Sequence, residues 1–434
     1  MIKVLKLGGT SVGSAANMKK VAEIVRREQA RITILSAMSG TTDSLVRISR
    51  AAASGDRNAI EEQLAMLTDK YTRCIEELLR ERKQQALARM NATFGLIRDE
   101  AAAFEEYESE RKIIAQGELL TSAIFTAYLQ ETGLKAECLY SPDFMVKDPG
   151  EKVDTERIGR ALARVAGDDS TFFVAQGFIC SDSQGRIDNL GRGGSDYSAA
   201  LMGAAVEAAE VQIWTDIDGM HNNDPRFVDN TRPIRTMSFD EAAELAYFGA
   251  KILHPATIQP CKDHGIAVLL KNTMDPEAPG TTISNRDDDT KSFHAVAAKD
   301  GITVIRIHSA RMLMAYGFLR KVFEIFEQYR TPIDMITTSE VAVSLTVDND
   351  SHIDEIVRDL SALGSIEIER GNSIVCVVGR MEHGDAGLAA RVFECVRGVP
   401  IKMISYGASH RSLAILIDTE HKKRTLQCLN DGLF

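Results

Sequence analysis

Paired cysteines, long apolar runs and a leader segment are all missing from this sequence. The seven cysteines are scattered, odd in number and form no C-x-x-C pair, so we expect reduced thiols that mostly serve as packing residues. No apolar run approaches the roughly 20 residues that a membrane-spanning helix needs. The first strand-like residues begin within two positions of the N-terminus, which leaves no room for a signal peptide. These absences predict a cytoplasmic protein with no membrane partner.

An excess of positive charge is also missing. The 62 Asp and Glu residues outnumber the 51 Lys and Arg residues, and the formal net charge is −11. We therefore expect no nucleic-acid partner, although this charge is compatible with a local basic pocket. The Walker A, HExxH and GxSxG patterns are absent, and no Cys/His cluster has zinc spacing. We predict no metal site built from protein ligands.

The length of the chain and the changing pattern of strand-like and helix-like segments along it predict several domains. With 434 residues it should hold roughly two to four of them. Residues 1–43 alternate strand, helix and strand, and residues 44–135 are strongly helical. Strand-like and helix-like segments then alternate again, which predicts an α/β fold with a mainly parallel sheet covered on both faces. The stretch MDPEAPGTTISNRDDDTKS places a domain boundary near residue 290.

An internal repeat occupies the remainder. GFLRKVFEIFEQYRTPIDMIT (residues 317–337) and GLAARVFECVRGVPIKMIS (residues 387–405) share a glycine, a Val-Phe-Glu triplet and a Pro-Ile-x-Met-Ile segment. Each copy has the pattern of a helix that feeds a strand, so we expect two small α+β units of one design. Such a duplication indicates a module that binds a ligand or joins subunits. The alternative is a paired sheet that only holds subunits together.

The first glycine turn stands in MIKVLKLGGTS. Lys6 interrupts an apolar run, and Gly8 and Gly9 let the backbone turn or approach a ligand closely. A strand, a glycine turn and a helix often present backbone N–H groups to an anion. A tight turn beside a solvated lysine is the alternative, and for this stretch alone it is the simpler interpretation.

The densest signal is LGRGGSDYSAALMGAA, which begins at Leu190. Its glycines form a loop, and Ser195 or Asp196 is expected to cap a helix of small residues. Such a helix start attracts anions, and Arg192 adds a planar fork suited to a carboxylate or a phosphate. An ordinary cap beside an exposed arginine is the alternative. Together with the first glycine turn, the loop favours a functional interpretation.

Further polar residues stand near the expected ends of strands and helices. Ser36 and Thr42 lie in SAMSGTTDS, and Glu118 is expected at a helix start, where a carboxylate also acts as a cap. The others are Thr215, Asp216 and Arg226 in WTDIDGMHNNDPRF, and Lys251 in the otherwise apolar YFGAKILHP. Cationic side chains, glycine loops and hydroxyls suit phosphoryl transfer, which needs charge neutralisation and positioning more than a strong nucleophile.

In order along the chain, KLGGTSV, GELLTS, LGRGGSDYSAA, WTDIDG with NDPR, and FGAKILHP resemble the motifs of the aspartate kinases. The repeat resembles tandem ACT domains, and MLMAYGFLRKVFEIF, PIDMITTSEVAVSLTVD and KMISYGASHRSLAILI are similar to the lysine-sensitive, single-function class. The resemblance covers almost the whole chain. It implies an amino-acid kinase domain in residues 1–290 and two ferredoxin-like ACT units in residues 291–434. The units are expected at 306–372 and 373–434, with 293–305 as a candidate strand of the second.

The resemblance implies phosphorylation of the β-carboxylate of L-aspartate by ATP with Mg²⁺, the first step of lysine, threonine and methionine biosynthesis. The implied catalytic residues are Lys6 and Asp196, and the implied substrate contacts are Thr42, Glu118, Arg192 and Ser195. The implied nucleotide contacts are Gly8, Gly9, Ser36, Thr215, Asp216, His221, Arg226 and Lys251. Because a carboxylate substrate is already ionised at neutral pH, no general base is required.

The resemblance also implies feedback inhibition by L-lysine. The residues that match a lysine site are Met312, Gly317, Phe318, Asp334, Ser339 and Glu340. Two carboxylates among them suit a cationic effector. The implied site lies at an ACT–ACT dimer interface, where lysine would shift the kinase toward an inactive arrangement. We expect a homodimer, with a tetramer as the alternative.

Two departures from the family pattern concern the nucleotide. His221 stands where tyrosine is frequent, and Ile187, Asp188 and Asn189 replace frequent threonines. Both changes bear on nucleotide affinity and positioning. Two other functions compete with the main interpretation: a kinase for a related carboxylate such as glutamate, and a catalytically silent amino-acid sensor. The ACT tail and the GRGGSDYSA loop argue against the first, and the intact charged site residues argue against the second.

Overall fold

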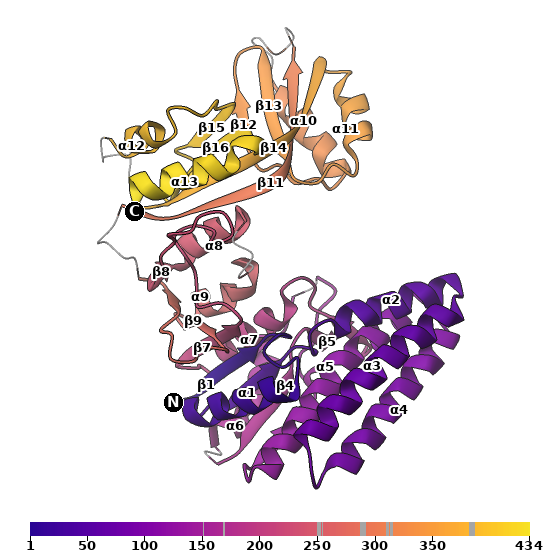
Figure 1. Cartoon of the computed structure of the whole chain (residues 1–434). Helices are drawn as coiled ribbons and strands as arrows, with labels where there is room; N and C mark the ends of the chain where they lie inside the picture. Colours follow the sequence, from indigo (N-terminus) through magenta and orange to yellow (C-terminus); the bar gives the residue numbers. More distant parts are fainter. Residues whose placement is uncertain are drawn as a thin grey trace. The chain divides into compact units, whose positions relative to one another are not determined.

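The computed structural model describes residues 1–150, 152–167, 170–249, 253, 255–286, 292–309, 312, 316–381 and 387–434. The chain divides into two compact units (Figure 1). The first comprises residues 1–220, 235–239 and 253–287, and the second comprises residues 221–234, 240–252 and 288–434. The division is therefore not a single cut at the boundary expected near residue 290. Two earlier segments fold with the second unit, where Val228 joins an apolar core.

The first unit is built on an eight-stranded sheet in the order β3-β4-β2-β1-β7-β9-β10-β8. Neighbouring strands are parallel except for β9 and β10, which confirms the mainly parallel sheet. All four residues of β2 are buried, so both faces of the sheet are covered. The strands are β1 (Lys3–Leu7), β2 (Ile32–Leu35), β3 (Ala136–Cys138), β4 (Phe172–Gln176), β7 (Glu210–Thr215), β8 (Thr236–Ser238), β9 (Ala267–Asn272) and β10 (Thr281–Ser284).

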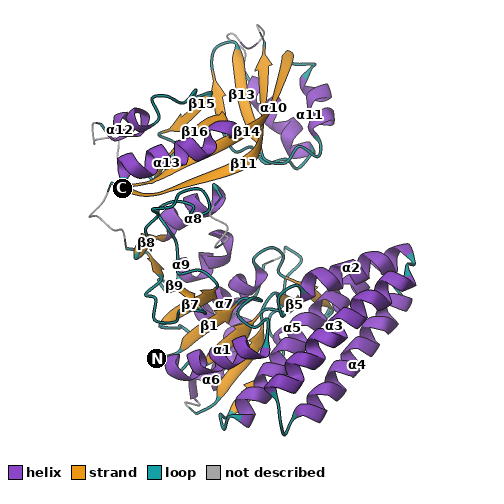
Figure 2. Ribbon diagram, in the orientation of Figure 1, coloured by secondary structure: helices purple, strands orange, loops and turns teal. Residues whose placement is uncertain are grey.

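The helical region expected at 44–135 forms a group of helices that lie side by side (Figure 2). They are α2 (Thr41–Ser54), α3 (Arg57–Leu78), α4 (Lys83–Ala102) and α5 (Glu106–Glu131). Their apolar faces share one core, to which Leu45, Leu64, Phe94 and Phe125 contribute. None of the helices in the described part of the chain is long and apolar enough to cross a membrane.

Shorter elements complete the first unit. They are α1 (Ala15–Glu28), α6 (Thr155–Gly167), α7 (Gly194–Ala205), α9 (Gln259–Asp263), the 3₁₀ turns Ser141–Asp143 and Pro255–Ile258, and the hairpin of β5 (Ile179–Ser181) and β6 (Ile187–Asn189). Helix α7 packs on β1, β2 and β7, in the middle of the sheet. That contact places the second glycine loop, which precedes α7, beside the first glycine turn, which follows β1.

The second unit contains a six-stranded antiparallel sheet in the order β12-β13-β11-β14-β16-β15. Two central strands are long, β11 (Phe293–His308) and β14 (Ser365–Gly379). The other strands are β12 (Ile336–Thr338), β13 (Ala342–Val347), β15 (Met403–Tyr406) and β16 (Ser412–Asp418). The helices are α8 (Phe239–Tyr247), α10 (Phe318–Gln328), α11 (Ile353–Leu360), α12 (Leu388–Cys395) and α13 (Lys422–Leu433), with a 3₁₀ turn at Thr419–His421.

The two long strands are shared by two α+β halves, in agreement with the repeat. The first half has a core from β11, α10, β13 and α11 that includes Ile305, Val322 and Leu345. The second half has a core from β11, β14, α12, β16 and α13 that includes Val296 and Val392. Residues 293–299 of β11 pair with the second half of β14. Because β11 continues to His308, the two halves form one continuous sheet.

A core substitution tests this assignment. Leu345 is fully buried on β13, so Leu345→Ala should lower the free energy of unfolding by about 2–5 kcal/mol through lost contacts and a cavity. Val341, just before the same strand, is 48% exposed, and Val341→Ala should change it by less than about 0.5 kcal/mol. Native-state hydrogen exchange of the β13 amides measures both effects. Equal losses in the two variants would contradict the burial pattern.

Candidate active site

A lysine–aspartate ion pair lies in a pocket of the first unit. Lys6 is on β1, between β2 and β7, and Asp196 is in the first turn of α7. Lys6 Nζ and Asp196 Oδ1 are 2.8 Å apart, and the two side chains are only 11% and 13% exposed. Burying an ammonium is costly without a partner, and Asp196 supplies one. The pair therefore holds the Lys6 ammonium in a fixed place that is still open to the pocket.

The first glycine turn brings β1 close to the residues that follow β2. Gly8 N donates to the Trp214 carbonyl at 3.2 Å, and Ser39 N donates to the Gly9 carbonyl at 3.0 Å. A Cβ on Gly9 would lie 2.8 Å from the Ala37 carbonyl oxygen, which is closer than side-chain carbons are found. Close backbone approach therefore requires glycine at this position.

The second glycine loop leads into a helix without a side-chain cap. Gly191 and Gly193 both have a φ of 72°, in the left-handed region that glycine tolerates, and Gly193 is the N-cap of α7. The expectation that Ser195 or Asp196 caps this helix is wrong, because the left-handed turn starts α7 already at Gly194. Both residues lie within the first turn and line the pocket instead. Gly194 N and Asp196 N donate to the Gly191 and Gly193 carbonyls, both at 3.0 Å, so the backbone itself satisfies part of this helix start.

The pocket has a volume of about 270 Å³. Its lining residues are Lys6, Ser36, Thr42, Glu118, Phe178, Gly191, Gly193, Gly194, Ser195 and Asp196. Ser36 Oγ donates to Ser195 Oγ at 3.0 Å, which links the end of β2 to α7. The fold thus brings together all the residues matched to catalysis and, Arg192 excepted, those matched to substrate binding.

Phe178 is the lining residue that no motif predicts. It has a positive φ of 69°, which is uncommon outside glycine. Its ring would lie 2.9 Å from a Cβ on Gly194, so the second glycine loop packs tightly on it. Phe178 N donates to Ser198 Oγ at 3.0 Å, which ties this strained residue to α7. A single aromatic residue after a strand carries no sequence signal for such a role.

Glu118 lies in the interior of α5, not at the helix start that the sequence suggests. The residues on either side of it continue the helical pattern, so it cannot serve as a cap. Glu118 is 3% exposed, and its Oε1 accepts a hydrogen bond from Ala37 N at 3.2 Å. Its Oε2 is buried and has no partner among the described residues. Burial raises the pKa of Glu118 to about 7, although the backbone hydrogen bond acts in the opposite direction.

Arg192 and Asp188 flank the pocket in different ways. Arg192 is exposed, and its guanidinium has no partner in the part of the chain that the structure describes. Asp188 is buried and pairs with Arg111 Nε at 2.5 Å and Lys147 Nζ at 2.8 Å. Although burial alone would raise it, hydrogen bonds from Lys147 and Arg111 hold the pKa of Asp188 below its ordinary value. The departure at Asp188 therefore serves a structural ion pair.

The residues matched to the nucleotide are distributed over both units. Thr215 ends β7, where its Oγ1 accepts a hydrogen bond from Ile217 N at 3.2 Å, and Asp216 follows it exposed. His221 and Arg226 belong to the second unit. Lys251, which is also matched to the nucleotide, lies outside the described residues.

Both of these second-unit side chains already have partners. His221 Nδ1 is 3.0 Å from Thr231 Oγ1. Arg226 Nη2 is 2.6 Å from Asp224 Oδ2, and Arg226 Nε also contacts the same carboxylate. The sequence does not reveal that Arg226 is paired with an aspartate two positions away, because aspartates and asparagines in such a stretch are also typical of turns.

The residues matched to a lysine effector all lie in the second unit. Met312 packs against the core of the first α+β half, Gly317 is the N-cap of α10 with a φ of 81°, and Phe318 is buried at its first position. Ser339 and Glu340 are exposed before β13. Asp334, by contrast, has a side chain only 1% exposed.

Converging metal ligands are not found among the described residues, where no group of three or more His, Cys, Asp or Glu side chains could hold a metal ion. Among the described residues that line the candidate pocket, the one cationic side chain is that of Lys6, which is paired with Asp196.

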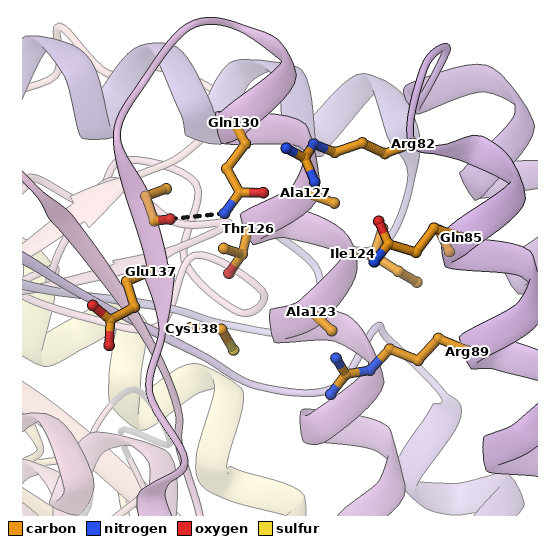
Figure 3. A pocket seen from close by; sticks show the side chains of 12 residues that line it. Arg82, Gln85, Arg89, Ala123, Ile124, Thr126, Ala127, Gln130, Glu137 and Cys138 are labelled. Carbon is orange, nitrogen blue, oxygen red and sulfur yellow. Dashed lines mark hydrogen bonds between the residues drawn. The ribbon is translucent and has the colours of Figure 1, made fainter.

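A second hollow of about 250 Å³ lies in the same unit, lined by α4, α5 and β3 (Figure 3). Its polar groups largely serve the fold, since the Gln130 amide donates to a backbone carbonyl at 2.8 Å and Glu137 pairs with Arg164. Arg82 and Arg89 are exposed to solvent at its rim. Because its lining contains neither a glycine turn nor a lysine–carboxylate pair, we assign the chemistry to the first pocket.

The comparisons with known proteins agree with this assignment. The amino acid kinase family model matches residues 1–272, and an ACT domain model matches residues 375–433. Lysine-sensitive aspartokinase 3 of Escherichia coli is 34% identical over 100% of this chain and 99% of its own length. The E. coli aspartokinase III structure with aspartate and ADP has a TM-score of 0.86, 32% identity and full coverage of both chains. The structure with lysine and aspartate has a TM-score of 0.83, also at 32% identity, with 100% and 99% coverage.

Fold and site thus define an amino acid kinase with a C-terminal ACT region. Within that class, the chain belongs to the aspartokinase family, as its motifs predicted.

The pH dependence of stability tests the environment of Glu118. Because folding raises the Glu118 pKa, the folded chain holds this proton more tightly, and stability is lost as the pH rises from about 4.5 to about 7. Glu118→Gln removes that loss, so its free energy of unfolding relative to the wild type should increase across this window by up to about 3 kcal/mol. Urea unfolding near both ends of the window measures the difference. Glu106→Gln, exposed on the same helix, is the matched control, and a difference independent of pH would contradict the raised pKa.

Proposed function

We propose that the chain transfers the γ-phosphoryl group of ATP to the β-carboxylate of L-aspartate and forms 4-phospho-L-aspartate. The observation that carries the proposal is the Lys6–Asp196 pair in a pocket beside two glycine turns. Phosphoryl transfer depends on positioning and on neutralised charge, and a fixed ammonium beside a helix N-terminus supplies both. The relative solved with aspartate and ADP supports the same pair of ligands here.

Lys6 is proposed to neutralise the charge on the transferred phosphoryl group. Asp196, 2.8 Å from the ammonium, orients it. Gly8 and Gly9 let the backbone approach the phosphates, since no side chain intervenes. Ser36, which already contacts the α7 turn, extends this phosphate-facing surface.

Glu118 is proposed to bind the α-ammonium group of aspartate. Its buried Oε2 lacks a partner among the described residues and lines the pocket, so a cationic donor would satisfy it and favour its ionised form. The unpaired guanidinium of Arg192 suits the α-carboxylate, which it can bind with two parallel hydrogen bonds. Thr42 and Ser195, both in the lining, are proposed to hold the reacting β-carboxylate.

The reaction requires no base from the protein. One oxygen of the ionised β-carboxylate forms a bond to the γ-phosphorus while the bond from that phosphorus to the bridging oxygen of ADP breaks, and the electron pair leaves with ADP. The absence of a catalytic histidine from the pocket lining agrees with this. Mg²⁺ is proposed to enter with the ATP phosphates, because the described residues offer no carboxylate cluster of their own.

Thr215 and Asp216 are proposed to lie along the nucleotide. They follow β7, which is parallel to β1, so they emerge at the same sheet edge as the first glycine turn. In open α/β sheets, ligands bind at the carboxyl ends of the strands. His221, Arg226 and Lys251 are proposed for the nucleotide from the motif match, and ATP would then compete with Asp224 for Arg226.

We further propose that L-lysine inhibits the enzyme, which would place it at the first step of lysine, threonine and methionine biosynthesis in the cytoplasm. The name of the relative and its lysine complex support the effector. Met312, Gly317, Phe318, Asp334, Ser339 and Glu340 are the proposed contacts. We propose a homodimer joined through the ACT units, or a tetramer built from such dimers.

The decisive test is acyl phosphate formation with ATP and Mg²⁺, trapped by hydroxylamine. L-aspartate and L-glutamate are compared as substrates, each with and without L-lysine. We expect turnover of aspartate that lysine suppresses. Turnover of glutamate in preference to aspartate would favour a related carboxylate kinase, and no turnover of either would favour a silent amino-acid sensor. If lysine leaves aspartate turnover unchanged, the proposed reaction stands and the proposed inhibition by L-lysine is refuted.

Removal of the Lys6 ammonium tests the mechanism. Lys6→Met should lower the rate of acyl phosphate formation at least about 10²-fold, because a donor aimed at developing charge is lost. Lys20→Met, at an exposed position on α1, should leave the rate unchanged. Circular dichroism of both variants shows whether the fold persists. Near-normal turnover by folded Lys6→Met would refute the role.

A further inference from the structure

A buried carboxylate of the second unit has two resident partners. Asp334 lies in the segment before β12, and its Oδ1 accepts a hydrogen bond from the Tyr247 hydroxyl at 2.8 Å. The same oxygen is 2.8 Å from Lys299 Nζ. Asp334 Oδ2 is sealed from solvent and has no partner in the region that the structure describes. One oxygen of this carboxylate is thus saturated, while the other can still accept a donor.

Among the described residues, the charges around Asp334 do not balance. Lys299, on β11, also pairs with Asp348 Oδ2 at 2.8 Å, and its Nζ lies 4.5 Å from the centre of the Tyr247 ring. Although burial alone would lower it, hydrogen bonds to Asp334 and Asp348 hold the pKa of Lys299 above its ordinary value, so the ammonium stays charged. Two carboxylates therefore share one ammonium, and the cluster is complementary to one further cation.

Tyr247 connects this cluster to the kinase sequence. It is the last residue of α8, which lies within the segment matched by the amino acid kinase family but folds with the second unit. Two other contacts hold this region on β11. Glu241 Oε1 is 2.6 Å from His294 Nδ1, and a Cβ on Gly249 would lie 2.2 Å from the Ala298 carbonyl oxygen. The end of α8 is therefore packed directly against the strand that carries Lys299.

We propose that Tyr247 is a positioning residue that couples the effector carboxylate to the kinase sequence, an inference that rests on the proposed inhibition by lysine. A cation at Asp334 Oδ2 draws negative charge away from Oδ1 and weakens the hydrogen bond from the Tyr247 hydroxyl. Tyr247 stands only four positions before Lys251, which is proposed for the nucleotide. The proposed route therefore runs along the chain from the end of α8 toward Lys251.

The test is Tyr247→Phe, which removes the hydroxyl and keeps the ring beside Lys299. Tyr329→Phe is the matched control, because Tyr329 likewise donates to an aspartate, Asp359, at 2.7 Å. Acyl phosphate formation is titrated with L-lysine, and lysine binding is measured by calorimetry on the full chain. In Tyr247→Phe we expect unchanged activity without lysine, lysine affinity within about threefold of the wild type, and activity at saturating lysine raised at least about fivefold. The control should behave as the wild type.

Two outcomes would overturn the proposal. An activity at saturating lysine equal to that of the wild type would show that the hydroxyl transmits nothing. A parallel loss of binding and inhibition would show that it only shapes the effector site. If the wild type neither binds lysine nor is inhibited by it, the proposed regulation fails. Hydrogen exchange then tests whether the Tyr247 hydroxyl anchors α8 through Asp334. Faster exchange of the α8 amides in Tyr247→Phe would still support the anchoring role, and unchanged exchange would overturn it.

Discussion

The ion pair between Lys6 and Asp196 is the contact on which the rest of the site depends. A lysine on a central strand cannot stay buried without a counter-charge, and the first turn of α7 provides it at 2.8 Å. The pair therefore links the first turn of α7 to β1. Glu118, from the helical layer, and Ser36, from the end of β2, complete a lining that is organised around this one ammonium.

Backbone geometry explains how an acidic chain can offer an anion site. The net charge is −11, yet the pocket does not rely on a basic surface. Gly9 allows two backbone segments to approach, and Gly191 and Gly193 take the left-handed turn that leaves α7 uncapped. The N-terminus of α7 and a single fixed ammonium then supply the positive potential locally. The net charge of a chain bears on which partners its whole surface attracts, but it does not determine the electrostatic potential inside a single pocket.

The second unit shows why a repeat in sequence need not produce two separate domains. The two α+β halves have their own cores, but β11 and β14 pass through both. The long strands tie the two halves together, because β11 pairs with β14 along both halves, with register shifts between Lys299 and Val304. The family match assigns α8 to the kinase, whereas packing assigns it to this sheet. Such a segment is suited to carry information between an effector site and a kinase sequence.

Local patterns by themselves determined the parallel sheet, the glycine turns, the repeated α+β design and the candidate lysine, because each depends on side-chain periodicity or backbone preference over a few neighbouring residues. The tertiary structure alone decided which groups are partners. Glu118 lies inside a helix, and one of its carboxylate oxygens has no partner among the described residues. Gly193 is the N-cap of α7, and Phe178 lines the pocket. Asp334 pairs with Lys299 and Tyr247. Pairing and desolvation arise only when distant segments pack, so spacing along the chain cannot report them.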